Sequence, residues 1–391
     1  MTENKIPATL ANLADPVTSV LATTLPNPAT SVLAMLKDSG RCKYMQNGPL
    51  NSVISSEAEV GKFRLCSEKC DAMKATDGAN LIREYAGKYP ALLKKCVVPG
   101  YVEIQKIRDG VFVTVQLATR CGCDLLQWLS DEKLHRSEEQ RLAVMLQMAE
   151  DVACMHGVEL VHGDLKMENF VVQGVEGVDE DEDVRIIDVR IIDFDTVMKG
   201  EAGATYGTHH GEISLGTMCN MPPEWWHKGC AAAECERRHG ARITKSVDMW
   251  CLGIAMFSVI TNVMPGITAD QSWKKWLQKE FPSQFDFKGS DMNDSSKLLN
   301  AMKTMVEDCN KKINEKWPQY SDLISKLLVM DEGNRLSAQQ LVEVLKEAQK
   351  KMLETKNIES KKEKEQKVTH SAAADSTNVK RLSGTKRKVV G

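Results

Sequence analysis

The sequence predicts an α+β fold in two lobes, a small and mostly β lobe followed by a larger and mostly α lobe. A β-like pattern begins at about Arg41 and ends at about Leu117. After it, apolar residues recur at helical spacing, most clearly over residues 138–156. The chain has 391 residues, of which 42% are hydrophobic, so it is long enough to build a sizeable core in each lobe.

Composition argues against several classes of protein and partner. The net charge is −3, which implies no overall attraction to nucleic acid or to an anionic membrane surface. We find no run near the roughly 18 apolar residues that a membrane span needs, and no secretory signal. The 12 cysteines are scattered without the spacing of a disulfide framework. We therefore expect free thiols and an intracellular location, cytoplasmic, nuclear or both.

Composition also divides the chain into three parts. Residues 1–38 are rich in small residues and prolines and contain a short near-repeat, which predicts a flexible or loosely docked leader, with a docking or targeting segment as the alternative. Residues 39–353 are the expected folded domain, with the small lobe at 39–117 and the large lobe at 118–353. Residues 354–391 are rich in Lys, Glu, Ser and Thr and lack the apolar content to fold alone.

Two charged segments are candidates for contacts with partners. Residues 175–183 are an acidic run, which is most simply a solvated loop, with binding to a basic partner or substrate surface as the alternative. Lys380-Arg381 and Lys386-Arg387-Lys388 form a basic cluster in the tail. Such a cluster fits a nuclear-import signal, a contact with an acidic surface or a merely solubilising tail.

The clearest elements of the small lobe are two strands, Val102–Ile107 and Val111–Leu117. They are joined by Arg108-Asp109-Gly110, which is a hairpin signal. A helix is expected around residues 79–85, after Asp77-Gly78.

In the large lobe we expect helices at residues 125–129 and 138–156 and in the strongly apolar stretch Ile254–Thr261. Residues 225–245 are interpreted as an insertion. It carries four residues of the types that bind zinc, His227, Cys230, Cys235 and His239. Their spacing matches no common zinc site well, so a surface loop is the expected form.

The stretch from Val161 to Phe170 carries three side chains suited to one kind of chemistry. Asp164 can accept the proton of a hydroxyl group, Lys166 can neutralise charge on a phosphoryl group, and Asn169 can supply an oxygen to magnesium. Phosphoryl transfer needs a set of this kind, because it depends on positioning and on electrostatic stabilisation.

A second magnesium ligand is expected in a tandem duplication. The residues Val-Arg-Ile-Ile-Asp end at Asp188 and again at Asp193. Only the second copy runs on, as Asp193-Phe194-Asp195. Because magnesium prefers carboxylate oxygens, Asp193 and Asn169 form a chemically sensible pair, with Asp188 as the minor alternative.

These motifs resemble those of eukaryotic protein kinases of the serine/threonine type. Residues 162–169 are similar to that family's His-Arg-Asp catalytic loop, and Asp193-Phe194-Asp195 is similar to its Asp-Phe-Gly element. Residues 216–224 align with its Gly-Thr-x-x-Tyr-x-x-Pro-Glu segment. This resemblance implies that Thr217 bonds to the catalytic aspartate and lysine, and that Glu224 pairs with a late arginine, Arg335. The chain departs from the family at Gly163, which replaces the arginine, and at Asp195, which replaces the glycine.

The resemblance is weaker in the small lobe. Gly48 and Val53 fit a degraded glycine-rich loop over the nucleotide. The lysine that holds the α- and β-phosphates of ATP is expected to be Lys69, with Lys62 as the alternative, and its partner on the following helix is expected to be Glu84. Two residues of the second hairpin strand would contact adenine, Val115 as gatekeeper and Leu117 at the hinge.

The function implied is transfer of the γ-phosphoryl group of Mg-ATP to a serine or threonine hydroxyl of a protein substrate. Asp164, Lys166 and Thr217 would be catalytic, and Asn169 and Asp193 would hold the metal. The alternative is a pseudokinase, a nucleotide-binding or protein-binding scaffold of the same fold, supported by the degraded loop, Gly163 and Asp195. A small-molecule kinase of related fold is a third, weaker possibility.

Overall fold

The computed structural model describes the chain in segments. These segments are residues 43–47, 51–55, 59–66, 69–108, 111–119, 121–130, 137–176, 185–200, 222–226, 244–262, 295–358 and 362. Residues 1–342 and 343–391 form two separate units, and each is considered by itself. The predicted leader, most of the acidic run, the zinc-type residues and the basic cluster lie outside the described residues, so the predictions about them and about the domain boundaries remain predictions.

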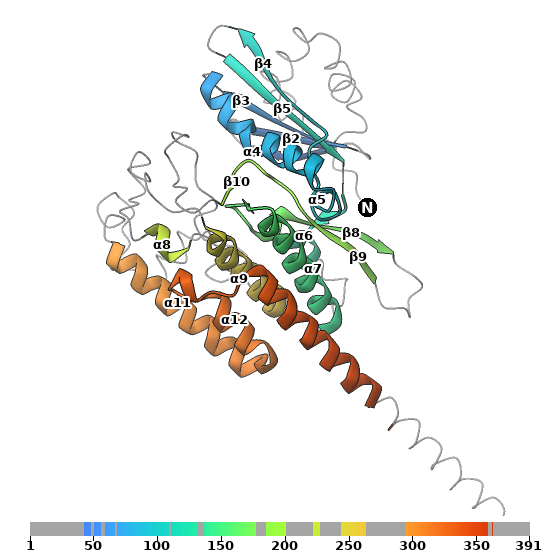
Figure 1. Cartoon of the computed structure of the whole chain (residues 1–391), viewed down its shortest axis with the longest axis vertical. Helices are drawn as coiled ribbons and strands as arrows, with labels where there is room; N and C mark the ends of the chain where they lie inside the picture. The colour runs from blue at the N-terminus through green and yellow to red at the C-terminus, as the bar shows by residue number, and fades with distance from the viewer. Residues whose placement is uncertain are drawn as a thin grey trace, which may run out of the picture. The chain divides into compact units, whose positions relative to one another are not determined.

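A five-stranded sheet forms the first part of the fold (Figure 1). Its order is β1-β2-β3-β5-β4, and every neighbouring pair is antiparallel. The expected hairpin is confirmed, because β4 and β5 pair from Tyr101↔Leu117 to Arg108↔Val111. The strands are β1 Lys43–Asn47, β2 Asn51–Ser55, β3 Glu59–Cys66, β4 Tyr101–Arg108 and β5 Val111–Thr119.

One long helix, α4 (Lys69–Lys88), packs against β3, β4 and β5, and a short helix, α5 (Leu92–Lys95), follows it (Figure 1). The face of α4 that is buried carries small or apolar side chains at helical spacing, Ala72, Thr76, Ala79, Ile82 and Ala86. The helix expected around residues 79–85 is therefore confirmed, and it begins ten residues earlier, at Lys69.

Most of the duplicated sequence, Arg185–Ile191, forms a single strand of a second sheet. This sheet has the order β6-β8-β9, from β6 (Cys123–Asp124), β8 (Phe170–Glu176) and β9 (Arg185–Ile191). The repeat is five residues long, an odd number, so equivalent residues of the two copies point to opposite faces of a strand. Val189 and Ile191 are buried, whereas Asp188 pairs with Arg190 and is half-buried. The two aspartates reach different surroundings, because Asp188 lies within β9 whereas Asp193 lies beyond its end.

The second part of the fold is mostly helical, as expected. A capping box starts α7, in which Ser137 Oγ accepts from the backbone N–H of Gln140 and Gln140 Oε1 accepts from that of Ser137. In α9 every residue from Val247 to Thr261 is buried, so this helix forms the centre of the core. The helices are α6 Leu125–Ser130, α7 Glu138–Gly157, α8 Pro223–Trp226, α9 Lys245–Thr261, α11 Ser295–Lys316, α12 Ser321–Leu327 and a last helix over residues 338–358. None of the helices within the described segments is long and apolar enough to cross a membrane.

Asp248, in the first turn of α9, fixes the turn that leads to Asp164. One carboxylate oxygen accepts the backbone N–H of Gly163 at 2.8 Å, and the other accepts that of His162 at 2.8 Å and Nε2–H of His156 at 2.9 Å. Burial alone would raise the pKa of the Asp248 carboxyl, but the hydrogen bonds from His156 and His162 hold this pKa below its ordinary value. Asp248 is therefore a buried carboxylate with three donors.

Gly163 adopts a conformation that suits glycine. Its φ is +78°, in the left-handed region, and a Cβ there would lie 3.2 Å from the backbone oxygen of Thr196. An arginine at position 163, where the family has one, would therefore be strained in this turn.

The ion pair expected between Glu224 and Arg335 is confirmed. Two guanidinium nitrogens of Arg335 donate to the two carboxylate oxygens at 2.7 and 2.6 Å, which is bidentate geometry. The Arg335 side chain is fully buried and stacks on Trp250 at 5.1 Å. It also donates to the backbone oxygens of Val329 and Ser246. This arginine ties α8 to the start of α9.

We predict that Asp248→Asn lowers the free energy of unfolding by about 3 kcal/mol at pH 7, because an amide cannot serve three donors and carries no charge. Urea unfolding of both proteins measures the difference. A depressed pKa contributes stability above the ordinary aspartate range that is lost only as pH falls through the folded value. The difference should therefore not shrink between pH 7 and about pH 4; a difference that fades by pH 5 would contradict this assignment. Asp322→Asn, at an exposed ion pair, is the control.

We also predict that Glu224→Gln lowers the free energy of unfolding by about 3 kcal/mol, because it leaves the buried charge of Arg335 without its counter-ion. Lys326→Met, which removes an exposed i,i+4 pair with Asp322, should leave stability nearly unchanged. Equal losses in the two variants would show that burial of the Glu224 pair carries no special weight.

Candidate active site

The loop that contains Asp164 is held by its own side chains. It leaves β7 (Leu160–Val161), passes through a single turn of 3₁₀-helix at Met167–Asn169 and enters β8. Lys166 Nζ donates to Asp164 Oδ2 at 3.0 Å, and Asn169 Nδ2 donates to the backbone oxygen of Asp164 at 2.7 Å. The three residues that the sequence singled out therefore converge on one point.

Asn169 and Asp193 are brought together by the pairing of β8 with β9. The backbone N–H of Ile192 donates to the backbone oxygen of Asn169 at 2.9 Å. This hydrogen bond extends the β8–β9 ladder to the residue before Asp193. Asp193 itself has a φ of +65°, a left-handed conformation that aspartate tolerates better than most residues. A carboxylate beside a carboxamide is a donor set that suits magnesium, so these residues fit the expected metal.

Lys62 reaches this group from the five-stranded sheet. It lies on β3, and its Nζ donates to Asp193 Oδ1 at 2.7 Å and to Asp195 Oδ2 at 2.6 Å. All three side chains are partly buried. Lys62, Asp164, Lys166, Asp193 and Asp195 are called the charged cluster below.

The electrostatics of the charged cluster keep its lysines protonated. Burial opposes the charge on Lys62, but the Asp193 and Asp195 carboxylates outweigh it and raise its pKa. Burial likewise opposes the charge on Lys166, whose pKa is raised by Asp164 and, more weakly, by Asp193. The pKa of Asp193 is lowered, because Lys62 outweighs the effect of burial on that carboxyl. The ammonium group of Lys166 therefore interacts electrostatically with both Asp164 and Asp193, so all three face one site.

This arrangement can perform defined chemistry. Two ammonium groups can bind phosphate oxygens and stabilise charge that develops on them. The cluster holds one more carboxylate than ammonium groups, and this excess negative charge favours a divalent cation. Asp164 lies within reach of the same point and can accept a proton from a hydroxyl group.

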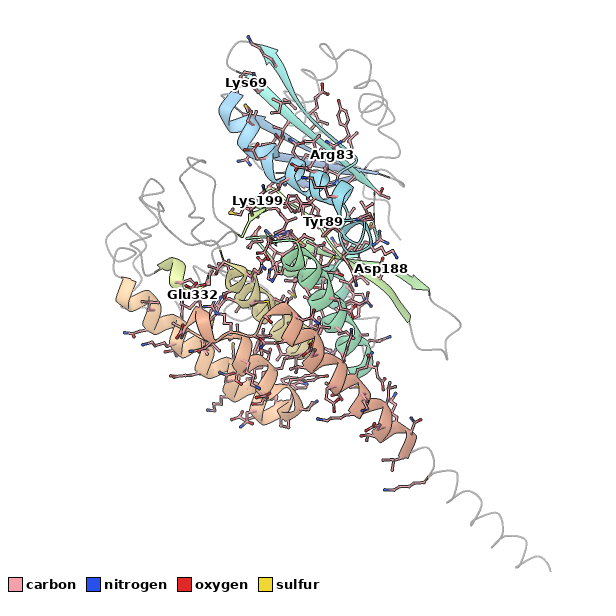
Figure 2. The ribbon with its side chains drawn as sticks, in the orientation of Figure 1. Lys69, Arg83, Tyr89, Asp188, Lys199 and Glu332 are labelled. Atoms are coloured by element: carbon pink, nitrogen blue, oxygen red, sulfur yellow. The ribbon has the colours of Figure 1, made fainter. Side chains whose placement is uncertain are left out.

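The structure does not pair Lys69 with Glu84, and it favours the alternative lysine, Lys62. Lys69 is the exposed first residue of α4, at the opposite end of that helix from Tyr89 (Figure 2). Glu84 is exposed and pairs with Lys88 one turn along the same helix, at 2.6 Å. The expected Lys69–Glu84 pair is not formed. Strand β3 ends at Cys66, so Lys69 falls beyond it, whereas Lys62 lies within it.

The register of the sheet places the side chain of Val115 on the face of β5 away from Lys62, whereas the expected hinge contact at Leu117 remains a prediction. Gln116 is directly opposite Lys62, and residues opposite each other in an antiparallel pair share a face. Val115 and Leu117 alternate with Gln116, so they lie on the other face of β5. Gln116 thus lies on the same face as Lys62, and its Nε2 donates to Asp195 Oδ1 at 3.0 Å.

Three further expected residues have no described site geometry. Gly48 and Thr217 lie outside the described residues, and Val53 lies on β2, where the backbone alone is described. Their roles remain predictions. Asp188, the alternative metal ligand, pairs with Arg190 at 2.6 Å.

Sequence reasoning missed Gln116 and the pairing of Asp195. A long polar side chain in a mostly apolar strand is a signal that could have drawn attention to Gln116, because buried polar side chains need partners. The partner of Asp195 could not be read from the sequence, because it depends on where β3 lies relative to the end of β9.

Comparison with known proteins agrees with this geometry. Residues 92–345 match the family described as the protein kinase domain. Human serine/threonine-protein kinase H2 is 23% identical over 62% of this chain and 50% of its own length. The liver/testis phosphorylase b kinase gamma catalytic chain of mouse is 26% identical over 56% of this chain and 43% of its own length. Serine/threonine-protein kinase PKZ1 of Phytophthora infestans is 29% identical, over 51% and 42%.

The chain spans about half or less of the length of these curated relatives. Among solved structures, a chain of the yeast RNA Pol II CTD kinase CTDK-1 complex matches with a TM-score of 0.50 and 14% identity. The match covers 76% of this chain and 90% of that one, and it shows the fold, confirming the predicted bilobal α+β class. Because the family match covers more than half of the residues, the chain belongs to the protein kinase domain family.

Proposed function

We propose that this protein is a serine/threonine protein kinase that transfers the γ-phosphoryl group of Mg-ATP to a protein hydroxyl. The observation that carries this proposal is the charged cluster, in which Lys62 and Lys166 meet Asp164 and Asp193. Phosphoryl transfer depends on bringing such groups to the terminal phosphate. The curated relatives named above include serine/threonine kinases, and this supports the choice of acceptor.

Each residue of the cluster has a defined task in this proposal. Asp164 orients the acceptor hydroxyl and takes its proton, while Lys166 holds Asp164 and stabilises charge on the transferring group. Lys62 binds phosphate oxygens of ATP. Asn169 and Asp193 hold magnesium, which when bound neutralises charge on the β- and γ-phosphates.

The intact cluster favours an enzyme over a scaffold. A protein that only binds partners has no need for a proton acceptor and two lysines at one point, all of them partly buried at an electrostatic cost. The proposed roles of Thr217, the acidic run and the basic tail rest on the sequence alone.

We predict that Asp164→Asn lowers kcat by at least about a hundredfold, because the proton acceptor is lost. Phosphoryl transfer from labelled ATP to a generic protein substrate measures this. The shift in melting temperature on adding Mg-ATP should remain, because the nucleotide ligands are unchanged. Labelling that is the same in wild type and variant would come from a contaminating kinase and would contradict the proposal.

A matched pair of variants tests which lysine binds ATP. Lys62→Met should lower kcat/KM for ATP by about a hundredfold, because a cation that contacts the phosphates is removed. Lys69→Met, at the exposed start of α4, should leave kcat/KM unchanged. The reverse outcome would restore Lys69 as the nucleotide lysine.

A further inference from the structure

Among the side chains of α4 that the structure describes, none is an acidic partner of Lys62, which pairs with Asp193 and Asp195 instead. In the family that this chain belongs to, a glutamate on this helix pairs with the nucleotide lysine. Here the buried face of α4 carries Ala72, Thr76, Ala79, Ile82 and Ala86. Asp77 and Glu84, the acidic residues of α4 whose side chains are described, are both exposed.

Gly78 explains why the helix has no room for such a side chain at its closest approach. A Cβ on Gly78 would lie 2.0 Å from the backbone oxygen of Phe194 and 3.1 Å from the carbonyl carbon of Asp195. The backbone of α4 therefore rests directly on the backbone of residues 194–195. Such close contact needs glycine, and it places Asp195 between the helix and the sheet.

Asp195 supplies a counter-ion to Lys62 from the end of β9. Its Oδ2 accepts from Lys62 Nζ at 2.6 Å, and its Oδ1 accepts from Gln116 Nε2 at 3.0 Å. Gln116 is 8% exposed and lies directly opposite Lys62 in the sheet. The backbone beside Asp195 is fixed too, because Thr196 Oγ1 donates to the backbone oxygen of His162 at 2.8 Å.

We propose that Asp195, oriented by Gln116, is the positioning residue that holds Lys62 in place of a glutamate on α4. This inference rests on one part of the proposed function, the binding of ATP phosphates by Lys62. In the nucleotide complex, Asp195 keeps its ion pair with Lys62, so that Asp193 is released from Lys62 and becomes available to the metal. The nucleotide lysine and a metal ligand are then positioned by one segment, Asp193-Phe194-Asp195.

The test measures the dissociation constant of ADP, with and without Mg²⁺, by calorimetry on the full chain. Asp195→Asn should weaken Mg-ADP binding and raise the KM for ATP by about tenfold, the effect of losing one charge-assisted hydrogen bond. Gln116→Met changes no charge and should weaken binding in the same direction, by a few-fold. The double variant should bind no worse than Asp195→Asn alone, because the two residues act through one contact.

The matched control is Asp188→Asn. Asp188 is the equivalent aspartate of the first repeat copy, pairs with Arg190 and lies outside the charged cluster. The Asp188→Asn variant should bind Mg-ADP with the same dissociation constant as the wild type. Melting temperatures without nucleotide identify any variant whose loss comes from misfolding, and Asp195→Glu, which keeps the charge, should recover part of the affinity.

Four outcomes would overturn the inference. Asp195→Asn could bind Mg-ADP as the wild type does, or its effects and those of Gln116→Met could simply add. Asp195→Asn could also lose affinity with Mg²⁺ present and none in EDTA, which would make Asp195 a metal ligand instead. No binding of Mg-ADP by the wild type would overturn both proposals. If the wild type binds nucleotide with the expected dependence but transfers no phosphoryl group, the proposed function fails while the inference stands.

Discussion

The ion pairs of Lys62 with Asp193 and Asp195 join the five-stranded sheet to the end of β9, and the geometry of the charged cluster depends on them. Partly buried charges lose hydration, and this cost is offset only when oppositely charged groups face each other closely. Each member of the cluster therefore stabilises the charged form of its neighbours. The raised pKa of Lys62 and the lowered pKa of Asp193 both result from this mutual stabilisation.

A second set of contacts fixes the loop that contains Asp164. Asp248 is supplied by α9, the most deeply buried helix among the described elements, and it fixes the backbone at His162 and Gly163. The Arg335 ion pair in turn ties the start of α9 to α8. The side chains of the charged cluster are thus supported by the buried core. Such support is needed to position side chains to within a fraction of an ångström.

The sequence was sufficient where function follows from residues close together in the chain. Asp164, Lys166 and Asn169 lie within six residues, so one turn brings them to one point. The sequence was not sufficient where the geometry depends on strand ends and strand register. Spacing from Val53 and Glu84 favoured Lys69, but β3 ends before that residue. The neighbourhood Val60-Gly61-Lys62 carried the better signal, and the register that puts Gln116 opposite Lys62 is a tertiary property.

The most direct measurement is a crystal structure with Mg²⁺ and a non-hydrolysable ATP analogue. We expect Lys62 Nζ within about 3 Å of a phosphate oxygen and of Asp195, and we expect Asp193 and Asn169 as ligands of the metal. A nucleotide whose phosphates contact Lys69, or one bound away from Asp164 and Asp193, would contradict the central claim that the charged cluster is the site of phosphoryl transfer.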